Sequence, residues 1–188
     1  MNYATIKYYD IANGPGVRTS VFVSGCRHHC PGCFNEVAWD FGYGQPFDKP
    51  VRNEVFASCK PDYITGLSLL GGEPFAPENQ AAVLAFVRQV REKFPLKDIW
   101  CWTGYLYEEL AAGKIGEHSR ELLTQLDVLV DGPFIMEQKY ITQEEYDAAV
   151  AEELVFNEDG QNEGEVQTNS TIYSWYEDQV INDVIEDL

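Results

Sequence analysis

The chain has few basic residues: 13 Lys and Arg stand against 31 Asp and Glu, which gives 188 residues a net charge of −18. Nucleic-acid binding depends on clustered Lys and Arg that neutralise phosphates. We therefore expect no nucleic acid among the partners. The charge is uneven, because residues 137–188 hold 15 Asp or Glu and one Lys, a charge of −14.

Long apolar runs and a secretory leader are also missing. No stretch approaches the roughly 20 apolar residues that span a membrane, and no basic segment followed by an apolar one opens the chain. We expect no membrane association and a cytoplasmic location. A chain of this length supports one core rather than two full-size domains. We predict a globular domain over residues 1–136 and an acidic, partly helical extension over 137–188.

Short apolar runs alternate with helical patterns in the first domain. Strands are predicted at 17–24, 64–70, 99–102 and 128–130, and helices at 48–59, 76–94, 105–112 and 117–126. Such alternation is typical of βα units on a parallel sheet. The units are too few for a complete eight-stranded barrel. The pattern therefore predicts an α/β fold, either a partial (βα) barrel or an open parallel sheet.

Disulfides are not expected, although the chain has five cysteines. In a cytosolic protein, clustered cysteines indicate metal binding first. Cys26, Cys30 and Cys33 lie close together, whereas Cys59 and Cys101 stand alone and are interpreted as small buried residues. Three thiolates on one loop can bind three irons of a cubane cluster and leave the fourth iron open to a small molecule.

The cysteine loop alone leaves a structural zinc site open as an alternative. Structural zinc takes four ligands, and His28 or His29 could complete a Cys3His set. We expect both histidines to be exposed loop residues rather than ligands. A non-enzymatic zinc module or an electron carrier thus stands against an enzyme, and metal analysis for zinc or for iron with sulfide separates them.

Two motifs at the ends of predicted strands resemble those of the radical S-adenosylmethionine (SAM) superfamily. The first is Cys-Arg-His-His-Cys-Pro-Gly-Cys at 26–33, and the second is Gly-Gly-Glu-Pro at 71–74. The resemblance implies a radical SAM type fold with a 4Fe–4S cluster on the three loop cysteines and SAM on its open iron. It implies that Gly71, Gly72 and Glu73 face the methionine part of SAM, and that Gly32, Cys33 and Phe34 lie beside the adenine. Glycine suits such positions because a backbone without a side chain can approach a ligand.

A wider set of segments resembles the activase family of anaerobic ribonucleotide reductase: residues 13–19, 33–35, 39–41, 102–105 and 130–134. This resemblance implies that flavodoxin or ferredoxin reduces the cluster and that SAM is cleaved to methionine and a 5′-deoxyadenosyl radical. The radical then takes a hydrogen from a glycine of the reductase large subunit. The same chemistry on another glycyl-radical enzyme, or on a small molecule, is the near alternative.

Thr103 and Asp131 also follow predicted strands, where the sites of parallel sheets gather. Asp131 is equally well explained as a turn residue before Gly132.

The acidic extension departs from the activase family, which ends in a short Arg-Gly-Ser-x-Asn-Gln tail. Thr142 and Glu145 form a capping box before an apolar pattern, and 157–165 is typical of a solvated linker. Residues 172–188 carry aromatic and β-branched residues at helical spacing. We predict that 172–188 packs, either on its own domain or on the reductase.

Overall fold

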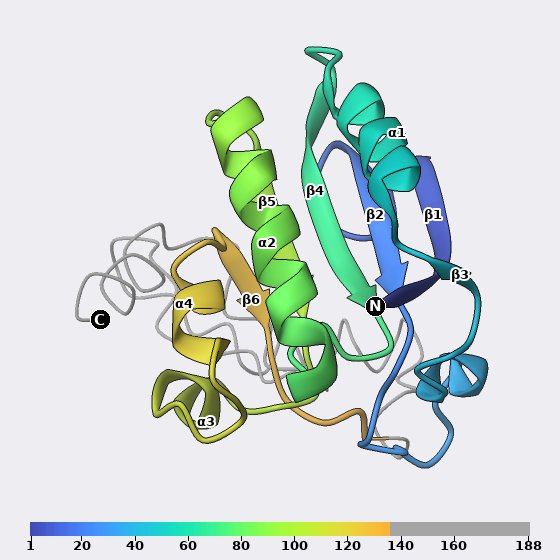
Figure 1. Cartoon of the computed structure of the whole chain (residues 1–188), viewed down its shortest axis with the longest axis vertical. Coiled ribbons are helices and arrows are strands. Elements are labelled where there is room, and N and C mark those ends of the chain that lie inside the picture. Colours follow the sequence, from blue (N-terminus) through green and yellow to red (C-terminus); the bar gives the residue numbers. More distant parts are fainter. Residues whose placement is uncertain (136–188) are drawn as a thin grey trace, which may run out of the picture.

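The computed structural model describes residues 1–135 (Figure 1), so the predictions for 137–188, including both helices and the linker, lie outside the described residues. In chain order the elements are β1 (Asn2–Asp10), β2 (Val17–Val23), the short 3-10 helix η1 (Glu36–Trp39), β3 (Gln45–Pro46), α1 (Lys49–Cys59), β4 (Ile64–Gly71), α2 (Pro77–Lys93), β5 (Asp98–Trp102), α3 (Tyr107–Ala111), α4 (Ser119–Leu123) and β6 (Val128–Val130). All the strands and helices predicted within this part are present. Among the helices of residues 1–135, none combines the length and apolar character that crossing a bilayer requires.

One mixed sheet organises the described residues, with strand order β3-β1-β2-β4-β5-β6. The four strands from β2 to β6 in this order are parallel, while β1 is antiparallel to both β2 and β3. The α/β class is therefore confirmed, with two antiparallel strands added at one edge. Strand β1 was not predicted, although Tyr, Thr and Ile favour strands, because its apolar residues do not alternate cleanly. Tyr3 packs edge-on against Phe47, but Tyr8 and Tyr9 are exposed.

The two long helices begin where the sequence predicts. Asp48 accepts a hydrogen bond from the backbone N–H of Val51 at 3.2 Å, and Pro50 lies in the first turn of α1, where its missing N–H leaves no bond unmade. Pro77 has the same place in α2. Both helices lie side by side on one face of the sheet (Figure 1).

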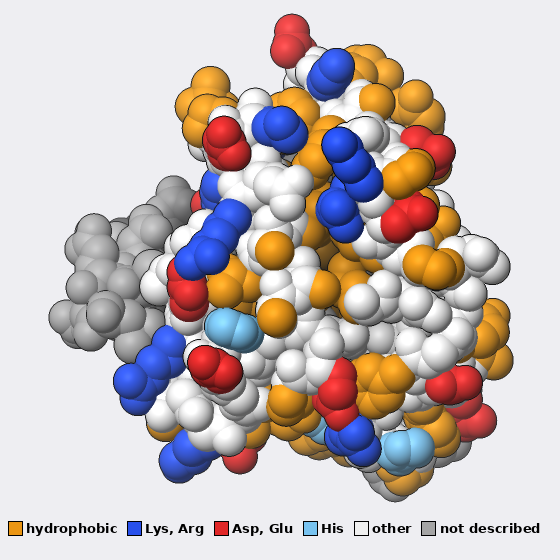
Figure 2. Space-filling view, in the orientation of Figure 1, with side chains coloured by type: hydrophobic (Ala, Val, Ile, Leu, Met, Phe, Trp, Pro, Cys, Tyr) orange, Lys and Arg blue, Asp and Glu red, His pale blue; other side chains and the backbone are white. Residues whose placement is uncertain are grey.

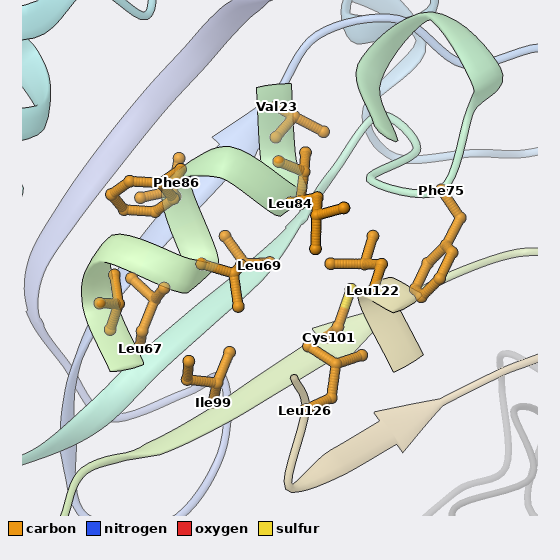
Figure 3. Close-up of a cluster of buried hydrophobic side chains, with 14 of the residues drawn as sticks. Val23, Leu67, Leu69, Phe75, Leu84, Phe86, Ile99, Cys101, Leu122 and Leu126 are labelled. Carbon is orange, nitrogen blue, oxygen red and sulfur yellow. The ribbon is translucent and has the colours of Figure 1, made fainter. Parts of the chain in front are cut away.

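The main core fills the space between this face and the helices (Figure 3). Leu67 and Leu69 of β4 point into it, and the rings of Phe56 from α1 and Phe86 from α2 stack with centroids 5.7 Å apart. Burial of such side chains is the dominant stabilising contribution. Both isolated cysteines, Cys59 and Cys101, are buried, as expected.

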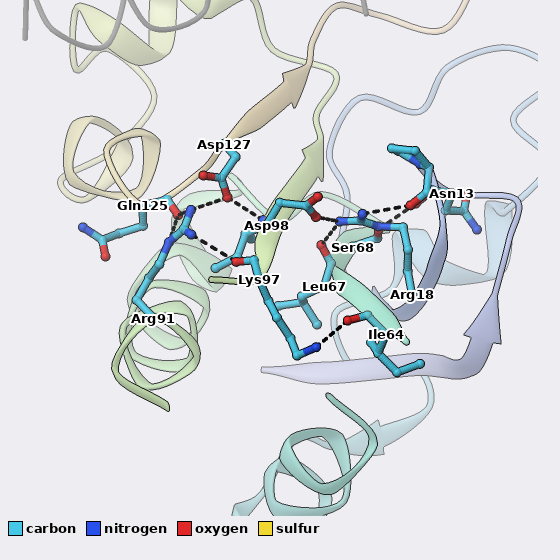
Figure 4. A network of polar contacts seen from close by, with 12 residues as sticks. Asn13, Arg18, Ile64, Leu67, Ser68, Arg91, Lys97, Asp98, Gln125 and Asp127 are labelled. Atoms are coloured by element: carbon cyan, nitrogen blue, oxygen red, sulfur yellow. Dashed lines mark hydrogen bonds and ion pairs between the residues drawn. The ribbon is translucent and has the colours of Figure 1, made fainter. Parts of the chain in front are cut away.

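A buried arginine joins three strands toward their amino-terminal ends (Figure 4). Arg18 of β2 has no exposed surface, pairs with Asp98 at the start of β5, and donates to Ser68 Oγ at 2.7 Å and to the Leu67 carbonyl at 2.9 Å. It also reaches the carbonyl of Pro15 at 3.2 Å. These contacts give segment 13–19, one of the segments of the resemblance, a role in holding the sheet together.

Candidate active site

The carboxyl ends of the four parallel strands lie along one edge of the sheet. Strand β2 leads into the cysteine loop 26–33, β4 into the turn 71–74, β5 into Thr103 and Gly104, and β6 into Asp131. Ligands of open parallel sheets bind at this edge, because the loops that follow the strands meet there. Segments far apart in the sequence are thus assembled into one candidate site.

Backbone hydrogen bonds fix the turn 71–74 to the segment that precedes the cysteines. The Gly72 N–H donates to the Val23 carbonyl at 2.7 Å, and the Glu73 N–H donates to the Gly25 carbonyl at 2.8 Å. The buried amide of Asn79, in the first turn of α2, donates to the Ser24 and Glu73 carbonyls, each at 3.0 Å. The two motifs therefore form one backbone unit, and Asn79 is a member that sequence reasoning missed.

Glu73 is the centre of this edge. Its carboxylate is 1% exposed and accepts from the Phe75 N–H at 2.8 Å, the Thr103 hydroxyl at 2.7 Å and the Gly104 N–H at 2.8 Å. The ring Nε2 of His28 lies 2.9 Å from Oε2 of Glu73, the oxygen that also accepts from the Gly104 N–H. A buried carboxylate with this many donors is well stabilised. Glu73 thus binds the ends of β4 and β5 and the cysteine loop together.

The histidines of the loop differ from each other, contrary to expectation. His29 is exposed, as predicted, and its ring lies 4.5 Å from that of Trp39. The prediction is wrong for His28, whose side chain is only 19% exposed and packs on Tyr105 with ring centroids 4.4 Å apart. Its contacts with Glu73 and Tyr105 explain this burial, and because both residues are distant in sequence, no sequence signal identified it.

Cys26 is the buried cysteine of the loop, with 8% of its surface exposed. Burial raises the pKa of its thiol to about 11, and the nearby charges of Glu73 and Cys30 act in the same direction. The backbone N–H groups of His28 and His29 oppose this by hydrogen-bonding to the sulfur. Positive charge beside this sulfur, such as a metal centre supplies, would favour the thiolate.

Cys30 and Cys33 are half-buried, and the Cys33 N–H donates to the Cys30 carbonyl at 3.1 Å. The Cys33 sulfur accepts from the Asn35 N–H at 3.4 Å. Within residues 1–135, no three Cys, His, Asp or Glu side chains are gathered closely enough to enclose a metal ion as they stand. The three thiols therefore share one loop, and they must turn toward a common centre to bind it.

Close contacts with the protein's own backbone require glycine at two positions of this edge. A Cβ at Gly72 would lie 2.7 Å from the Gly25 carbonyl oxygen, and one at Gly71 would lie 2.8 Å from the Cα of Phe22. The space beside both is filled by the protein's own backbone. Gly32 has a φ of +71°, which favours glycine, and Phe34 next to the cysteines is exposed.

Asp131 is buried at 2% exposure and accepts the Tyr107 N–H through Oδ2 at 2.6 Å. Its Oδ1 has no hydrogen-bond partner among the described residues. Burial raises the pKa of this carboxyl. An orphaned buried oxygen is costly, so a ligand that donates to it would be stabilising.

Comparison with known proteins agrees with this arrangement. A family model described as a 4Fe-4S single cluster domain matches residues 12–149. The anaerobic ribonucleoside-triphosphate reductase-activating protein of Pasteurella multocida is 44% identical over 138 residues, covering 71% of this chain and 84% of the relative. The protein of the same name from Vibrio cholerae is 44% identical over 140 residues, covering 73% and 87%. That of Enterobacteria phage T4 is 40% identical over 134 residues, covering 71% and 81%.

The chain belongs to the family of anaerobic ribonucleoside-triphosphate reductase-activating proteins. The 4Fe-4S match includes all four strand-end segments of the edge. It stops at residue 149, so 150–188 lie beyond it. Membership in the activating-protein family thus concerns the domain that carries the site.

Proposed function

We propose that this chain activates an anaerobic ribonucleoside-triphosphate reductase by generating a glycyl radical on it, through reductive cleavage of SAM at a 4Fe–4S cluster. The names of the relatives and the 4Fe-4S match support this proposal. The structural observation on which the proposal rests is the arrangement at the carboxyl edge of the sheet. The cysteine loop and the turn 71–74 are joined there by backbone hydrogen bonds and by the Glu73 carboxylate.

Cys26, Cys30 and Cys33 are the cluster ligands in this proposal, and the donor set of the loop fits that group. Three thiols are typical of a cubane cluster with one open iron. Backbone N–H groups already point at the sulfurs of Cys26 and Cys33, and such bonds stabilise anionic thiolates. Burial raises the pKa of the Cys26 thiol, and bound iron would supply the positive charge that favours its thiolate.

The edge also fits SAM, whose ammonium, sulfonium and ribose hydroxyls are positive or donor groups. The unpartnered Oδ1 of Asp131 is a buried acceptor at the same edge. We propose that the backbone of 71–73 holds the methionine part and that Gly32, Cys33 and Phe34 hold the adenine, while Glu73 acts as a positioning residue. When bound, the reduced cluster and SAM together supply the radical that takes a hydrogen from glycine.

The same proposal includes the role of the sheet, the electron donor and the location in the cell. The six-stranded sheet serves as the partial barrel of a radical SAM enzyme, with the substrate glycine entering at the carboxyl edge. Flavodoxin or ferredoxin supplies the electron. The protein works in the cytoplasm. A zinc module or an electron carrier is not favoured, because the matched family is a 4Fe-4S domain of activating proteins.

The experiment that tests the chemistry is anaerobic reconstitution followed by a SAM cleavage assay. Reconstituted protein should bind about four irons, as a thiolate-held cubane requires. With dithionite and SAM it should release methionine and 5′-deoxyadenosine in equal amounts. Stoichiometric zinc with no cleavage would overturn the proposal.

A further inference from the structure

A hollow of about 440 Å³ lies between the last turns of α1 and α2, lined by Asn53, Phe56, Ala57, Lys60, Lys93 and Phe94. It is at the opposite end of the domain from the cysteine loop, because both helices run back toward the amino ends of the strands (Figure 1). Figure 2 shows Lys and Arg side chains around a hydrophobic hollow on this helical face. The hollow therefore takes no part in the site described above.

The hollow combines an apolar floor with a basic rim. Phe56 and Phe94 supply aromatic surface, and the Lys93 ammonium lies 5.4 Å from the centre of the Phe56 ring. Lys60 and Lys93 are exposed, and neither pairs with a carboxylate of residues 1–135. The neighbouring Arg91 of α2, by contrast, pairs with Asp127.

The charge of this face is opposite to that of the chain. Helices α1 and α2, together with Lys60, hold six Lys or Arg and three Glu. Residues 1–135 as a whole hold 16 acidic and 12 basic residues. Lysines near helix C-termini also stabilise the helix dipole, but that role requires no hydrophobic hollow between them. An apolar floor with a basic rim is typical of a docking surface for an acidic segment that contains aromatic residues.

We propose that residues 172–188 of the same chain dock in this hollow. The segment has five Asp or Glu and no Lys or Arg, and its apolar residues are Ile172, Tyr173, Trp175, Tyr176, Val180, Ile181, Val184, Ile185 and Leu188. Its sequence predicts an amphipathic helix with an acidic outer face, which complements the floor and the rim.

The intervening chain is long enough for this contact. Fully extended, residues 136–171 span about 120 Å, which is more than the size of the domain they must cross. A segment tethered in this way has an effective concentration near the millimolar range, so modest affinity is enough for docking. Docking on the helical face leaves the edge with the cysteine loop open to the reductase.

Photo-crosslinking of the full-length, anaerobically reconstituted protein tests this contact. Benzoylphenylalanine replaces Asn53, an exposed residue of the hollow, and crosslinked peptides are mapped by mass spectrometry in an equal mixture of isotopically light and heavy chains. We expect crosslinks from position 53 to 172–188 within one chain. Lys60→Glu combined with Lys93→Glu should lower their yield about tenfold, from the loss and reversal of two surface ion pairs. Adding Glu177→Lys and Asp178→Lys should restore it.

Lys114→Glu is the matched control, because Lys114 is exposed on the loop between α3 and α4 and away from the hollow. It should leave the yield unchanged. Crosslinks between light and heavy chains would overturn the proposal in favour of a second copy, and crosslinks only to added reductase would overturn it in favour of the partner. Absence of any crosslink to 172–188 would also refute it. None of these outcomes depends on SAM cleavage, so the proposed function stands or falls separately.

Discussion

Two buried charged residues lie toward opposite ends of the same sheet and do different work. Arg18, toward the amino ends of the parallel strands, pairs with Asp98 and bonds groups of its own loop and of β4. Glu73, at the carboxyl ends, bonds two backbone N–H groups, a hydroxyl and the ring of His28. Arg18 joins strand to strand, whereas Glu73 joins the loops that carry the candidate ligands.

The difference shows that a motif residue need not touch a ligand. Both residues belong to segments that resemble a known family, and both side chains are occupied by protein groups. We expect damage at Arg18 to lower stability and damage at Glu73 to disorganise the site.

The largest effect is expected at the cysteines of the loop. Cys26→Ala, Cys30→Ala and Cys33→Ala should each abolish stable cluster binding and all SAM cleavage, because each removes one of three protein ligands. Iron and sulfide analysis with absorbance spectra measures this. Cys59→Ala and Cys101→Ala are the controls and should keep the cluster, since both are core residues. Cluster loss in either control would refute the ligand assignment.

Gly72→Val should disrupt the cluster and SAM binding together. The new side chain would press on the Gly25 carbonyl, from which a Cβ would be only 2.7 Å away, and so displace the start of the cysteine loop. Iron content and SAM affinity should therefore fall in parallel. Gly42→Ala is a milder control, because its Cβ meets only the side chain of Asp40, at 3.3 Å. A Gly72→Val protein with a full cluster but weak SAM binding would instead place the ligand directly against this glycine.

Glu73→Gln and Arg18→Met compare the two networks directly. Both should cost about 3 kcal/mol in the free energy of unfolding, because each leaves buried groups without partners. Glu73→Gln should also lower SAM cleavage per bound cluster at least about tenfold, whereas Arg18→Met should leave that ratio near the wild-type value. Chemical denaturation and the cleavage assay measure the two quantities. Equal losses of cleavage per cluster in both variants would remove the distinction.

Asp131→Asn should have the smallest effect on stability, and its sign should depend on pH. Burial raises the pKa of Asp131, so ionisation costs stability as the pH rises above the ordinary carboxyl range near about 3.9. The variant should therefore be the more stable protein at neutral pH, and its advantage should disappear in acid. SAM cleavage should still fall about tenfold if Oδ1 binds the ligand. Unchanged cleavage would make Asp131 a turn residue only, and thermal melts at several pH values check the first part.

The helices and strands of this fold could be predicted where neighbouring residues in the sequence define the hydrophobic pattern. Strand 128–130 appears with the expected bounds, and the helix expected at 48–59 spans 49–59 with Asp48 as its cap, because caps and apolar runs mark them. The location of the two motifs at the carboxyl edge could be predicted, because each motif follows a predicted strand of a parallel sheet. The role of His28 was not predictable, since its partner Glu73 lies 45 residues away. Likewise, the steric reason for Gly72 depends on the Gly25 carbonyl, which only the folded backbone brings near.

The most direct test of the central claim is electron paramagnetic resonance of the anaerobic reductase after incubation with this protein, SAM and a reductant. We expect a glycyl radical on the reductase that requires all three additions and is absent with Cys30→Ala. We also expect that the radical accumulates in proportion to 5′-deoxyadenosine. Rapid SAM cleavage with no radical on the reductase would contradict the account and assign the chemistry to another substrate.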